Sequence, residues 1–79
     1  MKVVIYTKNG CPNCVSAKMV LQIQDMAFEE RSIERAEHRE EFFSKFPDVR
    51  GMPQIFINDQ RVGGLLGLQE ALKQLKGAA

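Results

Sequence analysis

Apolar residues along the chain fall into short continuous runs and into rows at helical spacing. Residues 3–6 are β-branched or aromatic and predict a strand buried on both faces. Residues 54–57 predict a second clear strand, which a turn at 58–60 joins to a partner strand at 61–63. Residues 28–33 alternate poorly and carry several charges, which suits a strand at the edge of a sheet. The runs therefore predict four strands.

Three further segments predict helices, over about 12–25, 37–46 and 66–76. Pro12 fits a first helical turn, where its missing N–H has no partner, and Pro47 ends the second helix. The apolar residues that support these helices are Val15, Met19, Ile23 and Met26; the inward-facing Phe42, Phe43 and Phe46; and Leu65, Leu68, Leu72 and Leu75. The order βαβαββα predicts an α/β fold with a four-stranded mixed sheet flanked by three helices, its first βαβ unit parallel and right-handed.

The length and net charge of the chain limit its domain organisation and the partners that it can be expected to bind. The 79 residues predict a single domain spanning 1–79. A net charge of +1 gives no support for nucleic-acid or anionic-membrane partners, which favour a basic excess. The first apolar run is too short for a signal peptide, and no stretch approaches the roughly 20 apolar residues of a membrane span. We therefore expect a cytoplasmic monomer with no nucleic-acid or membrane partner.

The two cysteines, Cys11 and Cys14, lie where the first predicted strand gives way to the first helix. Free backbone N–H groups and the helix dipole favour a thiolate at this position, and the thiolate is the reactive form. Lys8, three residues earlier, adds positive charge nearby. Cys14 is one turn further into the helix and more enclosed. We therefore expect Cys11 to attack a disulfide and Cys14 to resolve the mixed disulfide that forms.

Two other interpretations of the cysteine pair are weaker. A closed zinc site needs four ligands, and His38 is the one further strong candidate, so we expect no metal site. Core cysteines without chemistry fit poorly with a strand, a Cys-x-x-Cys sequence and a helix in succession. Structural disulfides are also rare in a reducing compartment, where a close pair is typically catalytic or metal-binding.

Three motifs in the same order resemble the glutaredoxin family, and the match covers nearly the whole chain. Ile5-Tyr6-Thr7-Lys8 followed by Cys11-Pro12-Asn13-Cys14 is similar to its first strand and dithiol loop. Residues 52–57 resemble its proline-preceded strand, and Val62-Gly63-Gly64 resembles the glycine pair before its last helix. The resemblance implies a thioredoxin-like fold, a cis peptide bond before Pro53, and thiol–disulfide oxidoreductase activity with glutathione as co-substrate and no tightly bound cofactor.

The same resemblance implies where glutathione binds. Lys8 matches the basic residue that meets the glycyl carboxylate, and the backbone of Met52 matches the group that pairs with an extended substrate. Gly64 and Leu65 match the helix N-terminus that receives the γ-glutamyl carboxylate. The full set of implied glutathione contacts is Lys8, Asn13, Met52, Pro53, Gly64, Leu65 and Leu66.

Two departures from the family pattern keep more than one function open. Asn13 replaces a usual aromatic, and Leu65-Leu66-Gly67 stands where the family typically carries aspartates. One hypothesis is a glutathione-dependent enzyme that reduces protein disulfides and glutathione mixed disulfides. A second is a redoxin that serves one reductase, such as ribonucleotide reductase, and is recharged by thioredoxin reductase. A third, ranked lowest because Cys14 competes by disulfide formation, is an iron–sulfur carrier that uses Cys11 from two chains.

Overall fold

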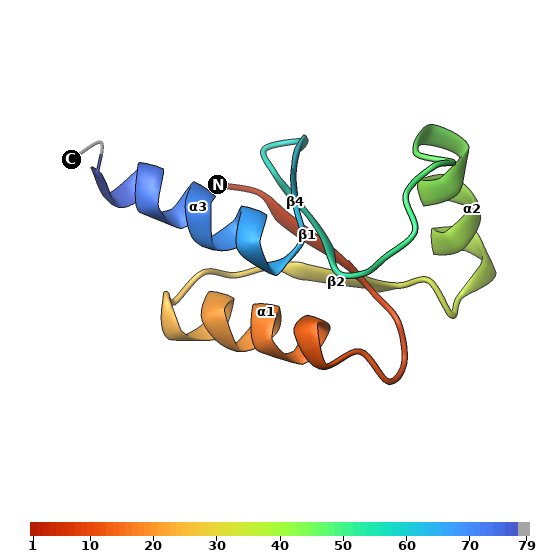
Figure 1. Ribbon diagram of the computed structural model, residues 1–79, viewed down its shortest axis with the longest axis horizontal. Helices are drawn as coiled ribbons and strands as arrows, with labels where there is room; N and C mark the ends of the chain where they lie inside the picture. Colours follow the sequence, from red (N-terminus) through yellow and green to blue (C-terminus); the bar gives the residue numbers. More distant parts are fainter. Residues whose placement is uncertain (78–79) are drawn as a thin grey trace.

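Four strands form one mixed sheet in the computed structural model, which describes residues 1–77. The elements in chain order are β1 (Val3–Thr7), α1 (Pro12–Ile23), β2 (Glu29–Ser32), α2 (Ala36–Lys45), β3 (Gln54–Ile57), β4 (Gln60–Gly63) and α3 (Leu65–Gly77). The strand order is β2-β1-β3-β4, with β1 and β2 parallel and the other two pairs antiparallel. The predicted element order, the parallel first pair and the edge position of β2 are confirmed (Figure 1). Over the described residues, no helix is long and apolar enough to cross a membrane.

The sheet separates two apolar clusters because successive side chains of a strand point to opposite faces. On one face Val3 and Ile5 of β1 pack with the buried residues of α1 and α3, Ala17, Leu21, Leu68 and Leu72. On the other face Val4 and Tyr6 pack against Phe42 of α2. Figure 1 shows α1 and α3 side by side, whereas α2 lies toward the end of the sheet where β2 stops. The α2 face is therefore only partly covered.

The apolar row that predicted α1 lies on its exposed side. Val15, Met19 and Ile23 are 55%, 54% and 76% exposed. The buried face instead carries Cys14, Ala17 and Leu21, which share the spacing of adjacent helical turns. The helix prediction was right, but this row does not supply its core contacts. In α2, Phe42 is buried as expected, whereas Phe43 is only partly buried. Phe46, predicted as the last residue of this helix, is its C-cap and is also partly buried.

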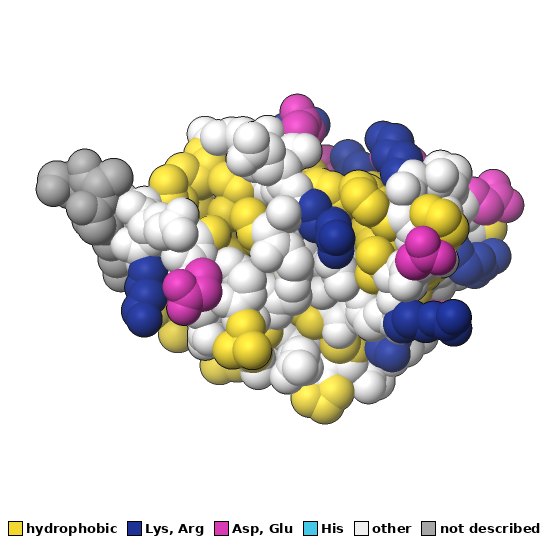
Figure 2. Space-filling view, turned by 45° about the horizontal axis from the view of Figure 1, so that its top comes forward, with side chains coloured by type: hydrophobic (Ala, Val, Ile, Leu, Met, Phe, Trp, Pro, Cys, Tyr) yellow, Lys and Arg dark blue, Asp and Glu magenta, His cyan; other side chains and the backbone are white. Residues whose placement is uncertain are grey.

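Charged side chains of both signs are intermixed on the surface. In the view of Figure 2 they gather mostly over the half of the molecule that holds α2. Arg31 of β2 is one centre of this region, since it contacts Glu29 and Glu41 and lies over the ring of Tyr6. The hydrogen bond to Glu29 raises the pKa of Arg31, against the opposing effect of burial, so the guanidinium group stays charged.

Candidate active site

The loop after β1 brings Cys11 to the N-terminus of α1. Beyond Thr7 the chain turns at Gly10, whose φ of 64° is a conformation that glycine adopts without strain. Cys11 is the N-cap of α1 and Pro12 follows in its first turn, as predicted. The Cys11 Sγ accepts a hydrogen bond from the backbone N–H of Cys14 at 3.1 Å. The sulfur therefore lies at the positive end of the helix dipole, where a thiolate is stabilised.

Cys11 and Cys14 are joined by a disulfide, with their Cα atoms 5.2 Å apart. Cys11 is 8% exposed and Cys14 is 2% exposed. Both residues are thus mostly buried, but a disulfide substrate has better access to Cys11. This difference supports the expectation that Cys11 is the attacking sulfur and Cys14 the resolving one.

A second loop faces the disulfide across the end of the sheet. The Met52–Pro53 peptide bond is cis, which confirms the expectation from sequence, and Pro53 is buried. The carbonyl oxygen of Met52 lies 3.5 Å from the Cys11 Sγ. The disulfide sulfur has no hydrogen to donate, whereas the reduced thiol carries one and can donate it to this carbonyl. The backbone before Pro53 therefore borders the reacting sulfur directly.

Two glycines allow close packing around the start of α3: Gly64, just before the helix, lies near the Pro53 loop, and Gly67 lies near β4. A Cβ atom added to Gly64 would lie 3.4 Å from the carbonyl oxygen of Pro53. A Cβ atom on Gly67 would lie 1.8 Å from the carbonyl oxygen of Val62, which is far closer than any real contact. Gly67 therefore allows the first turn of α3 to approach β4. This close packing was not predicted from the sequence, in which position 67 stood out only for lacking the carboxylate typical of the family.

The remaining predicted contact residues are accessible rather than packed into the site. Lys8, on the loop before the cysteines, and Asn13, between them, are exposed. Leu66 is 78% exposed and Leu65 is half-buried. Direct contacts thus join Cys11 to Cys14 and Met52, and Gly64 lies near Pro53, whereas no hydrogen bond brings Lys8 or Asn13 to these groups within residues 1–77. In this part of the chain, no three His, Cys, Asp or Glu side chains form a group that could hold a metal ion.

A charged network holds α1 against the strands that carry the site. Buried Thr7 donates its hydroxyl hydrogen to Glu30 at 2.8 Å, and the Lys18 ammonium of α1 lies 3.1 Å from the same carboxylate. Burial tends to raise the pKa of Glu30, but the hydrogen bonds from Thr7 and Lys18 outweigh it and lower that pKa. Glu30 is therefore ionised at neutral pH and links β2, β1 and α1. This network could not be predicted from local sequence patterns, because Thr7, Lys18 and Glu30 are far apart along the chain.

Comparison with known proteins identifies relatives over most of the chain. The family model described as Glutaredoxin matches residues 3–62. Glutaredoxin 1 of Rickettsia conorii is 34% identical over 74 residues, which cover 91% of this chain and 72% of that protein. Glutaredoxin 3 of Escherichia coli is 39% identical over 60 residues, which cover 76% of this chain and 72% of that protein. The crystal structure of glutaredoxin 1 from Francisella tularensis complexed with cacodylate superposes with a TM-score of 0.79 at 34% identity, covering 96% of both chains.

The close approach of Gly67 to Val62 generates a stability prediction. Alanine is the better helix former by about 1 kcal/mol, yet Gly67→Ala must displace α3 from β4. We expect a net loss of about 1–3 kcal/mol in the free energy of unfolding, measured by urea denaturation. The matched control is Gly51→Ala, because an added Cβ there meets no atom within 4 Å. A Gly67→Ala protein as stable as the wild type would contradict this account of the α3 packing.

Proposed function

This chain belongs to the glutaredoxin family and is a thiol–disulfide oxidoreductase with a Cys-x-x-Cys pair, and on that premise we propose that it is glutathione-linked and reduces protein disulfides and glutathione mixed disulfides. Its mixed sheet and three helices form the thioredoxin-like fold of that family, as predicted. The observation that carries the proposal is the Cys11 sulfur at the N-terminus of α1, 3.5 Å from the carbonyl of Met52. We further propose that residues 1–79 act as one domain, as a cytoplasmic monomer.

The proposed reaction proceeds by two thiol–disulfide exchanges. The Cys11 thiolate attacks a substrate disulfide, so that one S–S bond breaks, a mixed disulfide forms and one substrate thiolate leaves. The Cys14 thiolate then attacks the Cys11 sulfur, which forms the internal disulfide and releases the second substrate thiol. One glutathione reopens this disulfide as a mixed disulfide with Cys11, and a second removes the first as oxidised glutathione. The α1 dipole and N–H groups stabilise the sulfur anion at Cys11 at each stage.

The proposed glutathione site lies between the dithiol and the start of α3. The exposed ammonium of Lys8 would receive the glycyl carboxylate, and the backbone of Met52 before Pro53 would pair with the extended tripeptide. Backbone N–H groups at the beginning of α3, from Gly64 to Leu66, would receive the γ-glutamyl carboxylate. Asn13 would border the glutathione sulfur from the first turn of α1. The accessibility of Lys8, Asn13 and Leu66 supports this arrangement.

A second candidate keeps the dithiol chemistry and changes the electron source. Under this hypothesis the protein donates electrons to one reductase, such as ribonucleotide reductase, and thioredoxin reductase regenerates the dithiol. The favouring observation is the apolar start of α3, where Leu66 is 78% exposed and residues 65–67 include no carboxylate. No side chain there can pair with the amino group of glutathione.

An activity assay run with each of the two electron-donor systems distinguishes these two candidate functions. With a small disulfide as substrate, we expect turnover when glutathione and glutathione reductase are supplied, followed by NADPH absorbance. We expect much slower turnover with thioredoxin reductase alone. A protein without Cys11, Cys11→Ser, is the control for background exchange. Efficient reduction by thioredoxin reductase and none by millimolar glutathione would favour the second candidate and exclude the first.

The two cysteines should respond differently to replacement. Cys11→Ser removes the nucleophile, and we expect no measurable activity on any disulfide. Cys14→Ser leaves a monothiol, which can still exchange with a glutathione mixed disulfide but cannot resolve a protein mixed disulfide. We therefore expect partial activity on a glutathione mixed disulfide and at least a tenfold loss on a protein disulfide. Equal behaviour of the two variants in both assays would show that the assignment of roles is wrong.

Leu66 offers a test of the missing carboxylate. Its side chain is largely exposed, so Leu66→Asp removes little packing while adding a charge near the start of α3. We expect the Michaelis constant for glutathione to fall about fivefold, as one new charge-assisted contact would give. Leu66→Asn, which has a similar shape without the charge, is the matched control and should change it less. An unchanged constant for Leu66→Asp would contradict the proposed position of the glutathione amino group.

A further inference from the structure

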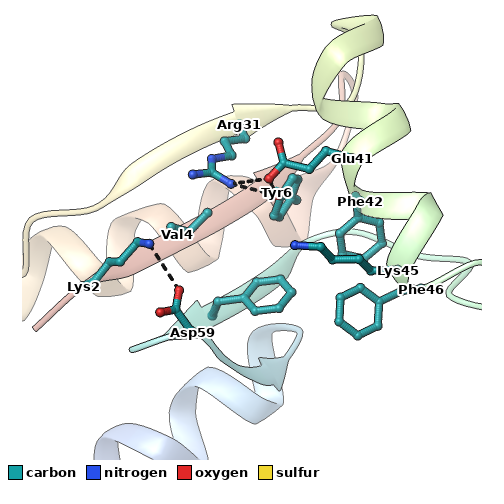
Figure 3. A pocket seen from close by; sticks show the side chains of 10 residues that line it. Lys2, Val4, Tyr6, Arg31, Glu41, Phe42, Lys45, Phe46 and Asp59 are labelled. Carbon is teal, nitrogen blue, oxygen red and sulfur yellow. Dashed lines mark hydrogen bonds and ion pairs between the residues drawn. The ribbon is translucent and has the colours of Figure 1, made fainter.

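A hollow of about 350 Å³ lies on the α2 face of the sheet, away from the dithiol. Val4 and Tyr6 of β1 line it together with Phe42 of α2 and Phe46, the C-cap of that helix (Figure 3). Phe56 of β3 also belongs to the lining. Neither cysteine, nor Met52 or Pro53, lines it. The hollow exists because α2 covers only one end of this face. Its volume is at the lower end of the range for small-molecule sites, roughly 300–1,000 Å³.

The charges around this hollow leave one cation unpaired. At one rim Lys2 pairs with Asp59 at 3.2 Å, and at the other Arg31 pairs with Glu41 at 3.2 Å. Lys45, in the last turn of α2, has no carboxylate oxygen within 4.0 Å in the described part of the chain. In Figure 3 its ammonium nitrogen lies in the middle of the lining side chains. Arg31 also contacts Glu29, which lies outside the lining, so the unpaired positive charge of this hollow is local to Lys45.

The Tyr6 hydroxyl in the lining already has hydrogen-bond partners. The Tyr6 hydroxyl accepts a hydrogen bond from Arg31 at 2.9 Å and donates one to Glu41 at 3.4 Å. The Lys45 ammonium makes no hydrogen bond within the described residues, so its donors are available to a ligand. Lys45 also lies in the last turn of α2, where the helix dipole favours a cation. A ligand with a single negative charge would complement Lys45, the one lining cation without a carboxylate partner among the described residues.

We propose that this hollow binds a small amphipathic carboxylate, with an aromatic or bulky apolar body and one negative charge. The carboxylate accepts hydrogen bonds from Lys45, and the apolar body lies on Tyr6, Phe42 and Phe56, which are already arranged as neighbouring rings. Glu41 is held by Arg31 and by the Tyr6 hydroxyl, which keeps its carboxylate at the opposite rim from Lys2 and Asp59. The site is separate from the dithiol, so its failure or success is independent of the proposed redox function.

The test uses 2-naphthoate as the probe and the oxidised full chain as the protein. In a ¹H–¹⁵N NMR titration, we expect saturable shifts at the backbone amides of Tyr6, Phe42 and Phe56. We expect 2-naphthoate to bind about fivefold more tightly than neutral 2-naphthamide, because one charge pair is added. Raising the salt concentration should reduce that preference.

Two lysine variants decide the role of the charge. Lys45→Gln should abolish the preference for 2-naphthoate over 2-naphthamide while leaving the weak apolar binding. Lys73→Gln, which changes an exposed lysine of α3, should keep the preference. The proposal would be overturned by NMR shifts confined to the Cys11 end of the molecule. It would also be overturned by equal affinity for the two probes, or by an unchanged preference for 2-naphthoate in Lys45→Gln. Glutathione-dependent turnover, measured in parallel without the probe, should be unaffected by Lys45→Gln.

Discussion

Burial of β1 on both faces is the constraint on which the rest of the structure depends. All five residues of Val3–Thr7 are buried, and the strand is hydrogen-bonded to β2 on one side and β3 on the other. Its odd positions supply the core under α1 and α3, and its even positions supply the core under α2. Thr7, the last residue of the strand, donates a hydrogen bond to Glu30. The loop that follows it ends at Cys11, the N-cap of α1. Because β1 has a strand on each edge and a packed cluster on each face, it fixes the start of α1 relative to the sheet. The position of the Cys11 sulfur is fixed with it.

The second fixed point is the loop before β3. Because β1 and β3 are antiparallel, with Tyr6 opposite Gln54, the end of one strand lies beside the beginning of the other. The cis bond before Pro53 therefore falls next to the N-terminus of α1, although some forty residues separate the two in sequence. Register, and not the loop alone, sets the position of the Met52 carbonyl beside Cys11. The start of α3 lies in the same region, since a Cβ atom on Gly64 would meet the carbonyl oxygen of Pro53.

Most of the strands and helices could be predicted because short runs of neighbouring residues determine them. Residues 3–6 and 54–57 were recognised as strands from their continuous apolar character, and Pro12 marked the start of α1. The cis bond came from family resemblance. The buried face of α1 was not predicted, because apolar residues occur on both sides of that helix and only the packing of Ala17 and Leu21 distinguishes them. The link from Thr7 through Glu30 to Lys18 was also missed, since it depends on contacts between separate elements.

The contact between Gly67 and Val62 restricts how this chain can diverge. No side chain fits at position 67 while α3 stays against β4, so that position is closed to substitution within this geometry. Its neighbour Leu66 points away from the core and is open to almost any residue. Adjacent positions of one helical turn thus differ sharply in mutational tolerance. A substitution at position 66 can therefore change the surface at this end of α3 without moving the fold, whereas a side chain at position 67 first requires a compensating shift of β4.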